Sequence, residues 1–114
     1  MENSLEKINA LETEKIPVMG KSGAAFDYNH VAFDGDFDKL SQMLGENYAG
    51  LYLFATNNGG TKVLYKGESD DIAKALKDNS LRETVSALGA TIFCYIPETE
   101  EFLRKDITED ICIG

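Results

Sequence analysis

The chain has 114 residues, of which 43% are hydrophobic, and this size supports one domain with one core but not two. Acidic residues outnumber basic ones by 20 to 11, and the resulting formal charge of −9, with two arginines and no basic cluster, disfavours binding to nucleic acid. No apolar run approaches the roughly 18 residues that cross a membrane, and the acidic N-terminus is unlike a signal peptide, so we expect a cytoplasmic protein without membrane contacts.

Residues 1–47 are predicted to form an N-terminal extension that packs on the remainder of the chain. It begins with apolar residues at helical spacing, which predict a short amphipathic helix: Leu5, Ile8 and Leu11. Residues 26–33 alternate in a pattern typical of an extended edge segment. Asp36 is suited to cap a helix over residues 37–44, and Gly45 to end it, because glycine tolerates the left-handed backbone found there.

Residues 48–114 are predicted to form a small α/β domain of the α+β type. Segments 49–55 and 61–67 have the composition of strands and are joined by Asn-Asn-Gly-Gly, which predicts an antiparallel hairpin. Residues 91–96 are almost continuously apolar, as in a strand that is buried on both faces. We therefore expect a three-stranded antiparallel sheet flanked by helices.

Three helices are predicted around this sheet. The first is capped within residues 69–71, and the second extends from a capping box of Ser80 and Glu83 to Gly89. The last begins at Thr99 and places apolar residues at three- and four-residue intervals: Phe102, Leu103, Ile107 and Ile111.

Two other features of the sequence do not indicate a functional site. Cys94 and Cys112 have apolar neighbours, so we expect buried free thiols, with Cys112 in the last helix. Gly20-Lys21-Ser22 is similar to the end of a phosphate-binding loop, but Lys15 replaces the earlier glycine of that motif and no apolar strand precedes it.

Glycine and tyrosine residues are paired across the predicted hairpin. Gly50-Leu51-Tyr52 lies on its first strand and Tyr65-Lys66-Gly67 at the end of its second, with 12 residues between the tyrosines. With the helices, third strand and acid-bearing last helix that follow, this pattern resembles the GIY-YIG nuclease superfamily, including the domain at the N-terminus of the excision-repair nuclease subunit. The resemblance covers residues 48–114.

The resemblance implies roles for these residues. In the family the paired tyrosine hydroxyls position or deprotonate the attacking water, so Tyr52 and Tyr65 are the candidate catalytic residues. A hydroxyl suits this role when nearby charge lowers its pKa from about 10 toward neutrality. Gly50 and Gly67 would permit close backbone approach and a sharp exit into the helix. Alternatively, both tyrosines are ordinary aromatic residues of the kind that strands favour.

Two other parts of the family site bear on activity. The family's phosphate-binding arginine lies on the helix after the second tyrosine, and Ala75 occupies that place here. The resemblance also implies a glutamate on the last helix that holds one divalent metal ion, a place that Asp106 or Glu109 could fill. Asp106 is the candidate expected to face inward, one turn from Phe102. Otherwise both acids are solvated groups on the helix exterior.

Loss of the arginine costs such a site on the order of a hundredfold or more in rate. We therefore predict a catalytically degenerate GIY-YIG-like domain that needs no cofactor and acts as an acidic protein-binding or regulatory module toward a basic protein surface. The alternative is a Mg²⁺-dependent endonuclease that cleaves DNA phosphodiester bonds, in which Lys74, Lys77 or Arg82 replaces the lost arginine. The acids near helix N-termini are also explained by the helix dipole alone.

Overall fold

Strands and helices alternate irregularly along the chain. The computed structural model describes residues 14–114, and the helix predicted around Leu5, Ile8 and Leu11 lies outside them. The elements are β1 (Lys15–Met19), β2 (Ala25–Ala32), α2 (Phe37–Leu44), β3 (Gly50–Asn57), β4 (Thr61–Ser69), α3 (Ile72–Ala75), α4 (Asn79–Leu88), β5 (Ile92–Pro97) and α5 (Glu101–Asp110). No helix in this part of the chain is long and apolar enough to span a membrane.

Within residues 14–114 the strands form one antiparallel sheet of five strands in the order β1-β2-β5-β3-β4. The prediction of three strands is wrong because β1 and β2 form a second hairpin that joins the sheet through β5. The segment predicted over residues 26–33 is extended, but it lies between two strands and not at the edge. On this side of the sheet the edge strand is β1, which accommodates Pro17 because an edge strand leaves one side of its backbone unpaired. Because proline is rare within strands, the sequence around Pro17 did not predict a strand.

The predicted hairpin of β3 and β4 is confirmed. Residues 58–60 connect the two strands, and Gly59 and Gly60 both have the positive φ angles, 75° and 132°, that side chains disfavour. On its other side β3 pairs with β5. Because β3 has a partner strand on each side and a covered face above and below, its residues from Gly50 to Ala55 are buried.

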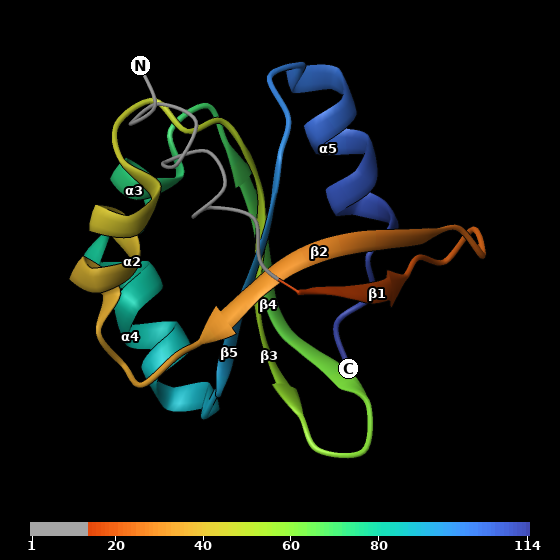
Figure 1. Ribbon diagram of the computed structural model, residues 1–114, viewed down its shortest axis with the longest axis horizontal. Coiled ribbons are helices and arrows are strands. Elements are labelled where there is room, and N and C mark those ends of the chain that lie inside the picture. The colour runs from red at the N-terminus through yellow and green to blue at the C-terminus, as the bar shows by residue number, and fades with distance from the viewer. Residues whose placement is uncertain (1–13) are drawn as a thin grey trace.

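The sheet separates two apolar cores, with α2, α3 and α4 on one side and α5 on the other (Figure 1). The aromatic face, beneath α2, α3 and α4, contains Phe33, Phe37, Leu40, Leu44, Tyr52, Phe54, Ile72, Leu76, Leu81, Val85, Phe93 and Tyr95. The α5 face contains Val18, Tyr28, Leu51, Leu53, Ala55, Val63, Ile92, Cys94 and Ile111. Consecutive residues of β3 contribute to opposite cores because side chains alternate along a strand.

Local capping signals determine several helix ends as predicted. The Asp36 carboxylate accepts a hydrogen bond from the Lys39 backbone N–H at 3.1 Å, and α2 begins at the next residue after this cap. Gly45 ends α2, and Gly89, with a φ of 76°, ends α4. These ends follow from the chemistry of the capping residues themselves.

The predicted capping box at the start of α4 is wrong. The helix begins at Asn79, and the Asp78 carboxylate accepts a hydrogen bond from the Leu81 backbone N–H at 3.1 Å. An aspartate caps a helix as well as a serine does. Because Asp78 precedes Ser80, it takes the free N–H and leaves Ser80 and Glu83 inside the helix.

The last helix turns a different side to the sheet from the one predicted. Phe102 and Leu103 are 73% and 41% exposed. The inward side carries Arg104, which is 5% exposed, followed one turn later by Ile107. Arg104 can occupy this inward position because Glu68 on β4 provides a carboxylate for it.

Both cysteines are free thiols, as predicted, but they differ in exposure. Cys94 is buried on the α5 face, and burial raises the pKa of its thiol to about 12. The expectation that Cys112 is buried and lies in the last helix is wrong, because α5 ends at Asp110 and Cys112 is exposed.

Candidate functional site

The two tyrosines of the hairpin lie on the same side of the sheet. Tyr52 on β3 is opposite Gly67, and Tyr65 on β4 is opposite Phe54. The centroid of the Phe54 ring lies 6.4 Å from the centroid of each tyrosine ring. Tyr52 is buried and Tyr65 is half-buried against the aromatic core. The structure thus brings the candidate catalytic phenols together as diagonal neighbours on adjacent strands.

A β-bulge decides that Tyr65 shares this face. Near the turn, Ala55 pairs with Val63. If this register continued along the hairpin, Tyr65 would pair with Leu53, whose side chain lies on the α5 face. The register shifts between Phe54 and Ala55, and Tyr65 moves opposite Phe54 instead. A shift of one residue exchanges the two faces of a strand.

Gly67 lies directly under the Tyr52 ring. A Cβ atom at position 67 would overlap the Tyr52 hydroxyl oxygen and lie 2.5 Å from Cζ. Glycine is therefore the residue that leaves space for this ring. Gly67 does not form the expected sharp exit into the helix, because β4 continues to Ser69 and α3 begins after it.

Gly50 permits close approach of two backbones. A Cβ atom at this position would overlap the Ile96 carbonyl oxygen on β5. A carbonyl in a paired strand can move aside only if the pairing of Gly50 with Pro97 is disturbed. Both glycines of the motif are therefore required by the packing of the hairpin against its surroundings.

The surroundings of the Tyr52 hydroxyl oppose its ionisation. Burial raises the pKa of this hydroxyl above its usual value, and Tyr65, Glu68 and Asp78 raise it further. A phenol that deprotonates water needs the opposite shift, toward neutral pH. At pH values near 7 the Tyr52 hydroxyl is therefore neutral and can donate a hydrogen bond but cannot act as a general base.

Replacing Tyr52 with phenylalanine is expected to make stability less sensitive to alkali. Because the pKa of Tyr52 is raised in the folded protein, the unfolded chain loses this proton first, near pH 10. The contribution of Tyr52 is fully present below about pH 10 and falls above it by up to about 1.4 kcal/mol per pH unit. Urea unfolding across this range measures the slope. Equal slopes for the wild type and Tyr52→Phe above pH ~10 would contradict the raised pKa.

Arg82 is engaged away from the tyrosines. Its Nη2 donates to the Asp38 carboxylate at 2.8 Å, and its Nε donates to the Leu76 carbonyl oxygen at 2.7 Å. The guanidinium carbon lies 5.3 Å from the centroid of the Phe37 ring. These contacts join α4 to α2 and α3, so the guanidinium holds the helical layer together.

Ala75 occupies the position where the resemblance implies an arginine. It is half-buried and packs against the aromatic core. Lys74 and Lys77, on either side of it, are exposed. A lysine also lacks the planar, bidentate donor geometry of a guanidinium.

Arg104 is buried on the opposite side of the sheet. Its Nε donates to the Glu68 carboxylate at 2.8 Å. Its Nη1 donates to the carbonyl oxygens of Thr99 at 2.8 Å and Glu98 at 3.3 Å. The guanidinium thus connects β4, the start of α5 and the segment between β5 and α5.

Lys66 holds the other end of the same helix. Its Nζ donates to the carbonyl oxygens of Thr108 at 2.7 Å and Ile111 at 2.6 Å, at the C-terminal end of α5. A cation is favoured there because the last carbonyls of a helix have no partner within it. Lys66 and Glu68 therefore fix α5 across β4. The opposite charges of Lys66 and Glu68, two positions apart on β4, were the feature of the sequence that could have indicated this role.

The candidate metal ligands lie away from the tyrosines. Asp106 and Glu109 belong to α5, which packs on the face opposite Tyr52 and Tyr65 (Figure 1). Both are exposed, so the expectation that Asp106 faces inward is wrong, because Arg104 takes the inward position of that turn. Within residues 14–114, no three histidine, cysteine or acidic residues are grouped so as to hold a metal ion.

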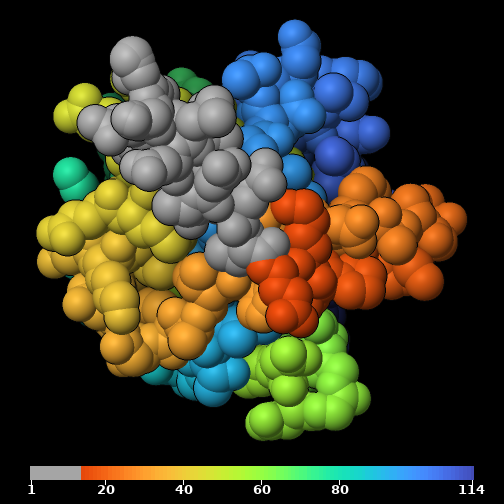
Figure 2. Space-filling view, viewed as in Figure 1, coloured from red at the N-terminus to blue at the C-terminus, as the bar shows by residue number. Residues whose placement is uncertain are grey.

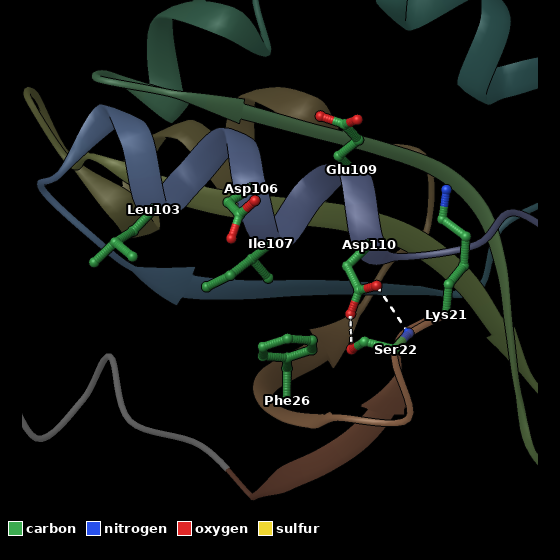
Figure 3. A pocket seen from close by; sticks show the side chains of 8 residues that line it. All are labelled: Lys21, Ser22, Phe26, Leu103, Asp106, Ile107, Glu109 and Asp110. Atoms are coloured by element: carbon green, nitrogen blue, oxygen red, sulfur yellow. Dashed lines mark hydrogen bonds between the residues drawn. The ribbon is translucent and has the colours of Figure 1, made fainter.

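A groove of about 580 Å³ lies between α5 and the β1–β2 hairpin (Figure 3). The backbone N–H and Oγ of Ser22 donate to the Asp110 carboxylate at 2.9 and 2.6 Å, and these bonds lower the pKa of Asp110. The segment similar to a phosphate-binding loop thus binds a carboxylate of its own chain. No local pattern in the sequence indicates this contact, because its partners are 88 residues apart.

The chain therefore has a mixed α+β fold, in which a five-stranded antiparallel sheet carries helices on both faces. No protein-family model, curated protein or solved structure matches it.

Proposed function

We propose that the chain is a GIY-YIG-like domain without nuclease activity, acting in the cytoplasm as an acidic protein-binding or regulatory module. Its partner is a protein with a basic surface. The observation that carries the proposal is that both arginines are paired with carboxylates of this chain. Tyr52 is also a buried phenol whose pKa is raised by burial and by Tyr65, Glu68 and Asp78.

The arrangement of the hairpin supports the resemblance. From β3 to α5 the chain runs strand, strand, helix, helix, strand, helix, which is the order that the motif implies. Tyr52 and Tyr65 share one face, and Gly67 accommodates the ring of Tyr52. These features maintain the shape of the site whether or not it performs chemistry.

The charges around the same site argue against cleavage of DNA. Glu68 and Asp78 act on the Tyr52 hydroxyl as negative charges, which would also repel a phosphodiester. Each arginine is paired with a carboxylate of this chain, Asp38 for Arg82 and Glu68 for Arg104. Affinity for nucleic acid comes mainly from cations that are available to phosphates.

The net charge of −9 supports a cationic partner. A surface with this excess of carboxylates attracts basic proteins over the distance of the screening length and repels phosphate chains. Electrostatic complementarity of this kind increases the association rate and selects among partners. A basic protein therefore fits the chain better than a nucleic acid does.

Supercoiled plasmid DNA provides the direct test of lost activity. In the presence of Mg²⁺ or Mn²⁺, we expect no nicking by the wild type and none by Tyr52→Phe. The physical reason is that no general base is available at Tyr52 near neutral pH. Robust nicking by the wild type that disappears in Tyr52→Phe would establish an endonuclease and overturn the proposal.

A further inference from the structure

We propose that the groove between α5 and the β1–β2 hairpin docks a protein segment that carries an apolar side chain flanked by arginine or lysine. This inference rests on the proposed binding function and names its site and the chemistry of its partner. The groove is lined by Lys21, Ser22, Phe26, Leu103, Asp106, Ile107, Glu109 and Asp110.

The groove has an apolar floor that remains accessible. Phe26 from β2 points toward α5, where Ile107 and Leu103 lie along the helix (Figure 3). Phe26 and Ile107 are half-buried against the core of the α5 face, so the fold holds them in place. Leu103 is 41% exposed, and Phe102 beside it is 73% exposed. These side chains offer an apolar contact surface to an apolar group of a partner.

Carboxylates border this floor. Asp106 lies beside Ile107, and Glu109 also lines the groove, although its carboxylate points to the other side of α5, away from Phe26 (Figure 3). Within the described part of the chain, neither makes an ion pair or a side-chain hydrogen bond, whereas Asp110 is engaged with Ser22. Arginine and lysine form their strongest hydrogen bonds with such carboxylates. The lining carries the three carboxylates of Asp106, Glu109 and Asp110 against the single cation of Lys21, so charge complementarity favours a basic segment as the occupant.

The walls of the groove come from elements that are fixed to each other. The β1–β2 hairpin projects from the body of the molecule next to α5 (Figures 1 and 2). Gly20 forms a backbone bridge with Ile111, and the hydrogen bonds from Ser22 to Asp110 close one end. A volume of about 580 Å³ is within the range of roughly 300–1,000 Å³ found for binding pockets. It can accept one large apolar side chain with its neighbouring residues.

A fluorescent peptide with leucine between arginines is the probe, and its binding to the full chain is measured by fluorescence anisotropy. The first control peptide replaces the leucine with serine, and the second replaces the arginines with glutamate. The groove variant is Asp106→Lys with Glu109→Lys, two exposed positions. The matched protein control is Glu46→Lys with Glu83→Lys, which changes the net charge equally at exposed positions outside the groove.

We expect the leucine–arginine peptide to bind the matched control only slightly more weakly than the wild type, through the changed net charge, and to bind the groove variant at least about tenfold more weakly than the wild type. Leu103→Ser is expected to weaken binding about fivefold, and both control peptides should bind less well than the probe. If the groove variant and the matched control bound the peptide equally weakly, the groove would not be the binding site, whereas the proposed binding function would still hold. Absence of binding by every arginine-containing peptide would overturn both.

Discussion

Replacing Arg104 with methionine is expected to lower the free energy of unfolding by about 2–4 kcal/mol. Arg104 is 5% exposed, and loss of its guanidinium leaves the Glu68 carboxylate without its partner. The carbonyl oxygens of Glu98 and Thr99 also lose their donor. The Glu68 side chain is 22% exposed, so water recovers part of the cost, which would be larger in a fully buried pair.

The neighbouring Lys105 provides a matched control for this effect. Lys105 pairs with Glu101 at 3.0 Å on the exposed side of the same helix, where both side chains are more than half exposed. Lys105→Met is therefore expected to leave the urea midpoint unchanged. If Arg104→Met and Lys105→Met shifted the midpoint equally, the buried contacts of Arg104 would contribute no stability. Glu68→Leu in the Arg104→Met background should recover part of the loss, since the unpaired carboxylate is removed.

Replacing Gly67 with valine is expected to destabilise the protein by about 1–3 kcal/mol or more. The intrinsic preference of strands predicts the opposite sign, because valine favours β structure and glycine disfavours it. The added side chain, however, would occupy the space of the Tyr52 ring, which is 5% exposed and cannot easily turn away. Urea unfolding of Gly67→Val and of the wild type shows whether the substitution lowers or raises the free energy of unfolding.

A double-mutant cycle identifies the ring as the cause of this loss. Tyr52→Leu removes the ring atoms that a side chain at position 67 would meet. Gly67→Val should therefore cost less in the Tyr52→Leu background than in the wild type, with a coupling of about 0.5–3 kcal/mol. Additive effects would show that the two positions do not compete for the same space.

Each residue of Tyr65-Lys66-Gly67 has a packing role in this fold. Tyr65 lies on the aromatic face, Lys66 binds the carbonyl oxygens at the end of α5, and Gly67 lies under Tyr52. Packing contacts alone therefore explain why these three residues occur at these positions.

The sequence placed the tyrosine pair on one hairpin but could not place it on one face. The spacing of Gly50-Leu51-Tyr52 and Tyr65-Lys66-Gly67 predicted adjacent strands, and this is confirmed. The shared face depends on the bulge between Phe54 and Ala55, which no local signal announced. On α5 the apolar spacing favoured Phe102 and Leu103 as inward residues, whereas the structure selects Arg104. A charged residue is placed inside only when a distant partner exists, and sequence spacing does not reveal partners.

By itself the sequence determined the net charge, the β3–β4 hairpin, the extent of α2 and the end of α4. These features depend on composition or on residues within one turn of each other, such as Asp36 and Lys39. Only the tertiary structure decided the five-stranded sheet, the ion pair between Glu68 and Arg104, and the contact of Ser22 with Asp110. The paired side chains are separated by 36 and 88 residues, so their energies depend on where the folded chain brings them. Propensity and capping act over a few residues, whereas burial and pairing of charges act across the whole fold.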